Sequence, residues 1–331
     1  MSAAPGTIKP MKEKRTFVIG DVHGQLDLLK TLERKIEKEC GKAGYEIVLT
    51  GDVMDRGPKS YEGYRYITDH PDISSVLGNH DDFYIGSKIK LMHAFVGNNG
   101  GRETFDNMLS YYSDAGNKIP EISSKPGLKL STDIQILYFH IKDLFTKYPQ
   151  LTENIKARYD GTKKTFLLHV FSEMRESLKK HPYIRTFEKN GNKFVLTHSG
   201  YVPTHKDGRI KTNEELKQIA ANGSGSEKAQ IEKILWTRKE VKNRVNDHII
   251  LHGHTPALRG ENGHGPNYCK KSDDLVSVNL DGGAAAMNNK RISGEVRDSA
   301  RLLCLELDSG KLMSIDRQGN MDSEIKVNGL F

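Results

Sequence analysis

The chain has 331 residues, of which 36% are hydrophobic and 28% are charged, a composition typical of a globular protein with a sizeable core. It contains no run of about 18 apolar residues, so we expect no membrane-spanning helix. The three cysteines, Cys40, Cys269 and Cys304, are too few and too far apart for a disulfide framework or a Cys-x-x-Cys zinc site. The composition therefore excludes membrane-spanning and disulfide-rich classes and favours a protein of a reducing compartment.

The net charge of +7 comes from 50 basic and 43 acidic residues that are mixed along the chain. Only Lys12–Arg15 forms a short basic cluster, so we expect no nucleic-acid partner, whereas a mildly positive field would favour phosphorylated substrates. Residues 1–15 contain Lys and Pro but no apolar segment, and we expect a disordered lead rather than a secretory signal. A cytoplasmic protein is the resulting expectation.

Strands and helices alternate in the first third of the chain. Apolar runs predict strands at Thr16–Ile19, Glu46–Leu49 and Ile73–Leu77, and helical spacing predicts helices at Leu26–Glu39 and Tyr61–Asp69. This alternation indicates βαβ units and a mostly parallel sheet. Ligands of such sheets bind beyond the carboxyl ends of the strands.

The middle of the chain has helical spacing. Apolar residues recur every three or four positions in Asp133–Tyr148 and in Lys164–Lys180. We therefore predict a helical insertion over about residues 88–181, within a single catalytic domain of residues 16–331. Two interpretations of this insertion stay open, a self-contained helical cap with its own small core or a segment whose aromatic side chains line the substrate groove.

The last third returns to strands, after an amphipathic stretch that ends at Leu235–Trp236. Short apolar runs predict five of them. The predicted strands are Phe194–Thr197, His248–Leu251, Leu275–Leu280, Arg301–Leu307 and Leu312–Ile315.

Three strings of polar residues bracketed by glycine follow the first three predicted strands. They are Gly20–Gly24 (GDVHG), Gly51–Gly57 (GDVMDRG) and Gly78–Asp81 (GNHD). Residues two apart on an extended segment face the same way, so Asp21 and His23 can bind one ion together. Carboxylate, imidazole and amide ligands suit manganese, iron or zinc better than calcium. Each string alone is typical of an ordinary turn, but three at successive strand ends indicate a metal site.

Two further strings follow later strands, Thr197–Gly200 (THSG) and His252–Pro256 (HGHTP). A lone histidine at a strand end is more often a structural residue than a ligand. Beside the three earlier strings we interpret these histidines as further ligands, and by residue type either His252 or His254 fits.

The five strings, in this order, resemble the phosphoprotein phosphatase family within the dinuclear metallophosphoesterases, and bacterial and lambda phage phosphatase-like members in particular. Asn99–Gly101, Trp236–Glu240 and Asn279–Gly283 add to the resemblance. The fold that it implies is α/β, the calcineurin-like metallophosphoesterase four-layer αββα sandwich, with two mixed sheets packed together and helices outside.

The resemblance also implies two divalent metal ions per chain, manganese first, with iron and zinc as alternatives. Each position of the implied ligand set has the expected residue type, which argues against an inactive scaffold protein. The implied ligands are Asp21 and His23 for the first metal, Asp52 as the bridge, and Asn79, His198 and His254 for the second. The family pattern places the ligand in Gly-His-Thr, which selects His254 and leaves His252 as a structural residue.

The resemblance assigns the proton donor for the leaving oxygen to His80, oriented by Asp55. It implies that Arg56 and Arg238 bind the phosphate oxygens of the substrate. A guanidinium can bind phosphate bidentately. Two cations about 3.5–4 Å apart can share a water and lower its pKa from about 15.7 toward 7. The resemblance thus implies direct attack on phosphorus by a metal-bound hydroxide.

Two substrate classes fit this pattern. The first is a phosphoprotein, so that the chain is a metal-dependent protein phosphatase for phosphoserine and phosphothreonine, with phosphotyrosine as a further substrate. The alternative is a dinucleoside polyphosphate such as diadenosine tetraphosphate, because hydrolases of that class share GDVHG and GNHD. Members that cleave symmetrically often lack the second Asp of the DRG string, which is Asp55 here, and its presence favours the protein phosphatase. Neither a cysteine-based phosphatase loop nor a P-loop occurs in the sequence.

Overall fold

The computed structural model describes most of the chain. The described residues are 14–41, 44–85, 96, 99–114, 119, 138, 141–158, 162–257, 267–271, 274–327 and 329–330. Of the predicted lead, residues 1–13 lie outside them, and Arg15 already begins the first strand.

The first sheet has six strands in the order β11-β10-β9-β1-β2-β3. Its three parallel neighbours β1, β2 and β3 come from the predicted βαβ region, and β9, β10 and β11 add antiparallel pairs. The strands are β1 (Arg15–Ile19), β2 (Tyr45–Leu49), β3 (Ile73–Ser75), β9 (Leu302–Glu306), β10 (Lys311–Ile315) and β11 (Ile325–Lys326). The βαβ prediction is confirmed, with α1 (Leu26–Cys40) and α2 (Ser60–Asp69) as its helices.

The second sheet has five strands in the order β4-β5-β6-β8-β7, with β5, β6 and β8 parallel to one another. The strands are β4 (Ile184–Lys189), β5 (Asn192–Thr197), β6 (Ile249–His252), β7 (Asn267–Lys271) and β8 (Asp274–Asn279). The sequence analysis did not predict β4, although Asn190-Gly191 signals a two-residue hairpin. Both turn residues have positive φ, 51° and 79°, as a type I′ turn requires.

The two sheets pack face to face. Because successive side chains of a strand point to opposite faces, both faces of the first sheet bury apolar residues. In β1, Val18 belongs to the apolar cluster between the sheets, together with Phe194 of β5 and Leu251 of β6. Its neighbours Phe17 and Ile19 face the other way, into the cluster that includes the buried side of α1. The expected mixed α/β fold of two sheets with helices outside is confirmed.

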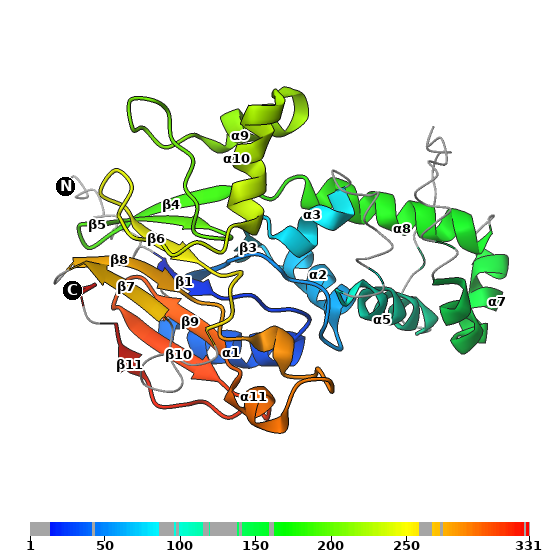
Figure 1. The fold of residues 1–331 in the computed structure, drawn as a ribbon. Helices are drawn as coiled ribbons and strands as arrows, with labels where there is room; N and C mark the ends of the chain where they lie inside the picture. Colours follow the sequence, from blue (N-terminus) through cyan, green and yellow to red (C-terminus); the bar gives the residue numbers. More distant parts are fainter. Residues whose placement is uncertain are drawn as a thin grey trace, which may run out of the picture.

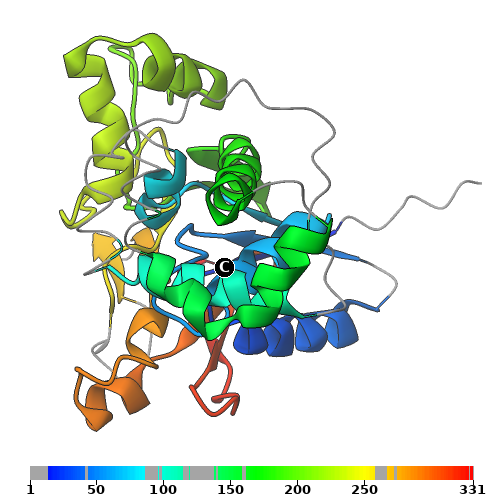
Figure 2. The same ribbon diagram turned by 90° about the vertical axis from the view of Figure 1, so that its right-hand side faces the viewer.

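The helical section lies at one end of the sheets (Figures 1 and 2). Its elements are α5 (Gly101–Ser113), the 3-10 helix η3 (Lys142–Lys147), α7 (Pro149–Arg158) and α8 (Lys163–Leu178). The helix predicted at Lys164–Lys180 is confirmed. Of the helix predicted at Asp133–Tyr148, the structure describes residues 138 and 141 as α-helical and residues 142–147 as the 3-10 helix η3, and residues 133–137, 139 and 140 lie outside the described ones. A new helix, α7, begins at Pro149. A residue before proline disfavours the α conformation, and proline suits the first helical position.

The described part of the helical section shares its core with the first sheet. One continuous buried cluster contains Phe17 of β1, Leu32 of α1, Phe105 of α5 and Phe166 of α8. The interpretation of a self-contained cap is therefore wrong, since these helices and the first sheet share their apolar interior.

The structure describes five further short helices. They are α3 (Asn79–Ile85), α9 (Asn213–Asn222), α10 (Gly225–Trp236), η4 (Ala284–Ala286) and α11 (Gly294–Ser299). Helix α9 was not predicted, although Thr212 and Glu215 form a capping box at its start. Among the described helices, none is both long enough and apolar enough to cross a membrane.

Candidate dinuclear metal centre

The loops that carry the five strings meet where the parallel strands of both sheets end. Gly253 after β6 donates its backbone N–H to the carbonyl of His198 after β5, at 2.9 Å. The backbone N–H of His254 donates to Oδ2 of Asp21 after β1, also at 2.9 Å, and so links the second sheet to the first. Residues up to 233 positions apart thus form one site.

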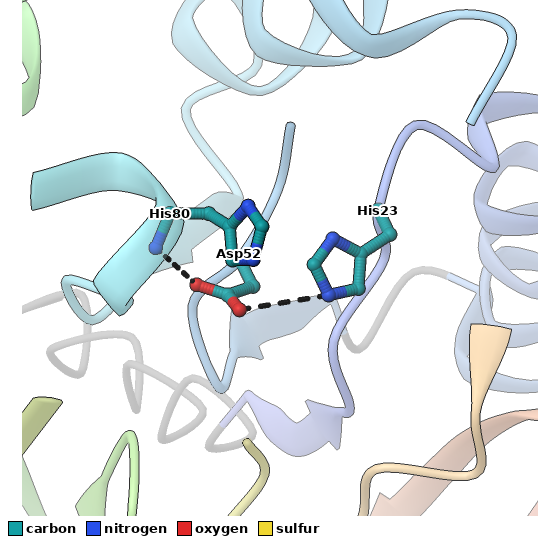
Figure 3. A group of neighbouring side chains, drawn as sticks. All are labelled: His23, Asp52 and His80. Atoms are coloured by element: carbon teal, nitrogen blue, oxygen red, sulfur yellow. Dashed lines mark hydrogen bonds and ion pairs between the residues drawn. The ribbon is translucent and has the colours of Figure 1, made fainter. Parts of the chain in front are cut away.

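The first cluster of potential ligands consists of His23, Asp52 and His80 (Figure 3). Nδ1 of His23 donates to the carbonyl of Met54 at 3.0 Å, so Nε2 carries the lone pair of the ring. That Nε2 lies 3.5 Å from Oδ2 of Asp52, and the backbone N–H of His80 donates to Oδ1 of Asp52 at 2.9 Å. Asp52 is therefore fixed with its carboxylate facing the histidines.

Asp21 lies beside this cluster, held by two donors. Its Oδ1 accepts from the Thr50 hydroxyl at 2.5 Å, and its Oδ2 accepts from the backbone of His254. A Cβ at Gly253 would lie 2.0 Å from Oδ1 of Asp21, so only glycine allows this approach.

The second cluster consists of Asp52, His198 and His254, and Asn79 lies between the two histidines. Oδ1 of Asn79 is 2.8 Å from Nε2 of His198 and 2.8 Å from Nδ1 of His254. Nδ1 of His198 donates to the carbonyl of Thr50 at 2.8 Å. The four predicted residues of the second metal are thus in contact with one another.

The donor set of the second cluster fits a cation. The neutral His198 ring keeps its proton on Nδ1, because the Thr50 carbonyl can only accept. Its Nε2 then presents a lone pair to Oδ1 of Asn79 and to Oδ1 of Asp52, 3.5 Å away. Three acceptors that face one another without a shared proton repel, and a divalent ion bound among them would turn this repulsion into coordination.

Burial sets the protonation of the ligands. Burial, followed by the charge of Arg56, lowers the pKa of His23 well below its usual value, and burial lowers the pKa of His254 to about 3. These rings are neutral near pH 7, as metal binding requires. Burial alone would raise the pKa of Asp52, but the surrounding histidines, His198 first, lower it below its usual range. Burial and the neighbouring carboxylates of Asp281 and Asp52 raise the pKa of Asp21, the usual result of placing buried acids close together.

The backbone of the site is strained. Among the described residues, eight other than glycine have positive φ, and five of them belong to the predicted site. Such conformations cost of order 1–3 kcal/mol each and persist where the surrounding contacts enforce them. The five are His23, Asp52, Asp55, Arg56 and His254.

The predicted proton donor His80 belongs to the first cluster. Its ring contacts that of His23 edge to face, with centroids 4.9 Å apart. Nδ1 of His80 lies 2.8 Å from Oδ2 of Asp55, whose side chain is fully buried. The predicted pair of His80 and Asp55 is formed, so the carboxylate fixes the orientation of the ring.

The two predicted phosphate-binding arginines lie near different clusters. Arg56 is half-buried, and its guanidinium donates to Nε2 of His23 at 3.2 Å. Arg238 is exposed at the end of α10, and its charge helps to lower the pKa of both His198 and His254. Both cations therefore lie close to the predicted ligands.

His252 and Asp281 lie close to the predicted ligands His198 and Asp21, respectively. His252 ends β6 with its ring against Gly200 and belongs to neither cluster, as the structural interpretation expects. Asp281 was not singled out, yet it follows the parallel strand β8 and is 2% exposed. Its carboxylate accepts from the backbone of Gly283 at 3.0 Å, and burial raises its pKa to about 6. The signal was present in the sequence, since Asp281 follows an apolar strand and precedes two glycines.

The family is decided by a model that matches residues 14–280, described as calcineurin-like phosphoesterase. The chain belongs to the calcineurin-like phosphoesterase family. It is therefore a metallophosphoesterase, and the resemblance found in the sequence is confirmed at this level. Divalent ions bound by this family's ligand set would supply an activated water and stabilise charge on phosphorus.

Curated relatives within the family share part of the chain. A protein of Photorhabdus laumondii named bis(5′-nucleosyl)-tetraphosphatase, symmetrical, is 32% identical over 126 residues, which are 38% of this chain and 43% of that protein. A protein of the same name from Escherichia coli is 46% identical over 67 residues, 20% of this chain and 23% of its own. The match thus spans less than half the length of these relatives.

Two solved phosphatases align with most of the chain at low sequence identity. The cold-active protein-tyrosine phosphatase of a Shewanella species aligns over 94% of this chain and 80% of its own, with 16% identity and a TM-score of 0.46. A protein serine/threonine phosphatase of Saccharomyces cerevisiae aligns over 96% of this chain and 81% of its own, with 12% identity and a TM-score of 0.39.

Proposed function

We propose that this metallophosphoesterase hydrolyses dinucleoside polyphosphates such as diadenosine tetraphosphate. The observation that carries the proposal is the name shared by its curated relatives, bis(5′-nucleosyl)-tetraphosphatase, symmetrical. The sequence analysis had placed phosphoproteins first, because Asp55 is present, and dinucleoside polyphosphates second. The proposal reverses that order.

The charges around the centre support an anionic substrate with several phosphates. Arg56 lies beside His23 of the first cluster, and the exposed Arg238 acts on His198 and His254 of the second. Guanidinium groups bind phosphate oxygens bidentately, so one phosphoryl group at the centre and its neighbour can each have a cationic partner. Water then attacks phosphorus, and the nucleotide on the other side of the broken bond leaves.

A second candidate substrate is a phosphoserine or phosphothreonine in a protein. The observation that favours it is the 2.8 Å contact between His80 and Asp55. A nucleotide leaves readily as an anion, whereas the alkoxide of serine must be protonated as it leaves. A buried carboxylate that orients a histidine is the arrangement such proton donation requires.

The two candidates separate in one experiment. Phosphate or nucleotide release is measured with manganese for diadenosine tetraphosphate and for phosphoserine, phosphothreonine and phosphotyrosine peptides, each with a chelator control. The proposal expects chelator-sensitive conversion of the dinucleotide to ADP with the highest kcat/KM of the set. A higher kcat/KM for the peptides would transfer the function to the second candidate.

The variant Asp55→Asn further distinguishes the phosphopeptide from the dinucleotide as substrate. Its loss on phosphoserine peptide should exceed its loss on the dinucleotide, because only the alkoxide needs a well-oriented acid. Absence of chelator-sensitive turnover on every substrate would contradict both candidates.

A further inference from the structure

The carboxylate of Asp55 is held by more than the histidine that it orients. Its Oδ2 faces Nδ1 of His80 at 2.8 Å. Its Oδ1 accepts from the Tyr84 hydroxyl at 2.6 Å and from the Thr104 hydroxyl at 2.5 Å. All four side chains are buried, so these bonds form away from water and are correspondingly strong.

The two hydroxyl donors come from different parts of the fold. Tyr84 lies on α3, one helical turn beyond His80, so the same short helix supplies the histidine and one anchor of its carboxylate. Thr104 lies in the first turns of α5, in the helical section. The carboxylate is therefore fixed from two independent directions.

The helical section also supports the strained loop that carries Asp55. The backbone N–H of Asp55 donates to the Thr104 hydroxyl at 3.2 Å, and that of Arg56 donates to the carbonyl of Gly100 at 3.4 Å. Asp55 and Arg56 have φ of 70° and 68°, a conformation that outside contacts must maintain. A Cβ at Gly100 would lie 2.6 Å from the nitrogen of Arg56, so glycine permits this approach.

Helix α5 is in turn fixed to the α/β part of the molecule. Oδ1 of Asn107 accepts the backbone N–H groups of Tyr61 and Glu62 at 3.0 and 3.1 Å, at the start of α2. Phe105, next to Thr104, is buried in the core shared with the first sheet. The position of the Thr104 hydroxyl is thus determined by packing on both sides of the helix.

We propose that Tyr84 and Thr104 are positioning residues that lock the Asp55 carboxylate so that it orients His80 toward the leaving oxygen. The proposal rests on phosphoester hydrolysis with His80 as proton donor, and it assigns part of the catalytic geometry to the helical section. A carboxylate with both hydroxyl bonds removed can rotate about its Cβ–Cγ bond, and small misplacements of a catalytic group slow reactions strongly.

The proposal predicts an effect that depends on the leaving group. Phenoxide needs a proton as it leaves, whereas 2,4-dinitrophenoxide leaves as an anion. Loss of the lock should therefore slow hydrolysis of phenyl phosphate and change hydrolysis of 2,4-dinitrophenyl phosphate much less. A merely structural defect would slow both substrates together.

The test compares Tyr84→Phe, Thr104→Val and Thr104→Ser with the unmodified chain, on both aryl phosphates with manganese. Tyr84→Phe and Thr104→Val should each lower kcat for phenyl phosphate about 10- to 100-fold, less than loss of the acid itself. Thr104→Ser keeps the hydroxyl and should restore most of the rate. Bound metal, measured by elemental analysis, should stay unchanged in all three.

Tyr61→Phe is the matched control. Its hydroxyl is buried as well and bonds to the hydroxyl of Tyr112 at 2.7 Å rather than to Asp55. This variant also loses a buried tyrosine hydroxyl. Its ratio of kcat for phenyl phosphate to kcat for 2,4-dinitrophenyl phosphate should equal that of the unmodified chain.

Equal slowing of both substrates in Tyr84→Phe and Thr104→Val, with metal retained, would overturn the proposal and leave the hydrolytic function intact. Failure of Thr104→Ser to restore the rate would also count against it. If the unmodified chain shows no chelator-sensitive hydrolysis of either ester or of the dinucleotide, the proposed function fails and this inference fails with it.

Discussion

Nε2 of His198 lies 2.8 Å from Oδ1 of Asn79, although both atoms are acceptors once the other ring nitrogen donates to the carbonyl of Thr50. The contact is unfavourable in the neutral protein and becomes favourable when a cation lies between the ligands. We therefore expect His198 and Asn79 to share one cation.

Metal should stabilise the folded chain. At a free manganese concentration about 100 times the Kd, one site contributes about 2.7 kcal/mol to the free energy of unfolding. Thermal unfolding followed by fluorescence should show a higher Tm with manganese than with a chelator. In His198→Ala the repulsion and the second metal are both lost, so the shift in Tm should shrink by about half and elemental analysis should find one equivalent. An unchanged shift would contradict the ligand assignment.

The two histidines of the HGHTP string should behave differently. His254→Gln should lose one metal equivalent and most of the turnover, because its ring contacts Asn79 at 2.8 Å. His252→Gln should keep both equivalents, since its ring packs against Gly200 outside both clusters. Metal content of the two variants, measured side by side, checks the assignment, and the reverse result would exchange their roles.

His80→Asn should lower turnover of a phosphoserine peptide by about 10²–10⁴, the usual range for a general acid. The backbone N–H of residue 80, which donates to Asp52, is unaffected, so metal content should stay at the level of the unmodified chain. Steady-state kinetics and elemental analysis give both values. Equal turnover would remove His80 from the mechanism.

Arg238→Ala should weaken substrate use without harming the fold. The side chain is exposed, so the free energy of unfolding should change by no more than about 0.5 kcal/mol. Loss of a charge-assisted hydrogen bond worth about 1.5–3 kcal/mol should lower kcat/KM about 10- to 100-fold. Arg238→Lys should recover only part of this, because an ammonium lacks the bidentate geometry. Full recovery by lysine would show that charge alone matters.

Stability should depend on pH through His181, which lies outside the site. Burial first, and then the charge of Lys217, lower its pKa to about 4, against about 6.5 in an unfolded chain. Between these values the unfolded chain binds more protons, so the free energy of unfolding falls as pH decreases, by up to about 1.4 kcal/mol per unit. Urea unfolding with saturating manganese should show a shallower pH slope for His181→Gln than for the unmodified chain. Identical slopes would exclude His181 as the cause.

Local patterns in the sequence were sufficient to predict features whose conformation depends on residues close together in the chain. The strand ends at Gly20, Gly51 and Gly78 could be predicted because an apolar run followed by glycine and a polar residue marks the point where a strand ends and a loop begins. The hairpin turn Asn190-Gly191 was equally local and was overlooked. The end of the helix predicted at Asp133–Tyr148 was also a local feature, because Pro149 begins a new helix.

Contacts between distant residues could not be predicted in this way. Thr104 bonds to Asp55 across 49 positions, and nothing in the sequence around threonine 104 marks it as different from other helix residues. Asp281 reaches the centre only because β8 is the third parallel strand of the second sheet.

The sequence by itself determined the residue types of the candidate ligands, their order along the chain and the two βαβ units, because residue chemistry and strand periodicity are properties of short segments. Only the tertiary structure decided that the helical section shares its core with the first sheet and that α5 reaches the carboxylate behind His80. The reason is physical: burial and hydrogen bonding between segments depend on how the two sheets and the helices pack, and short-range patterns do not encode that packing.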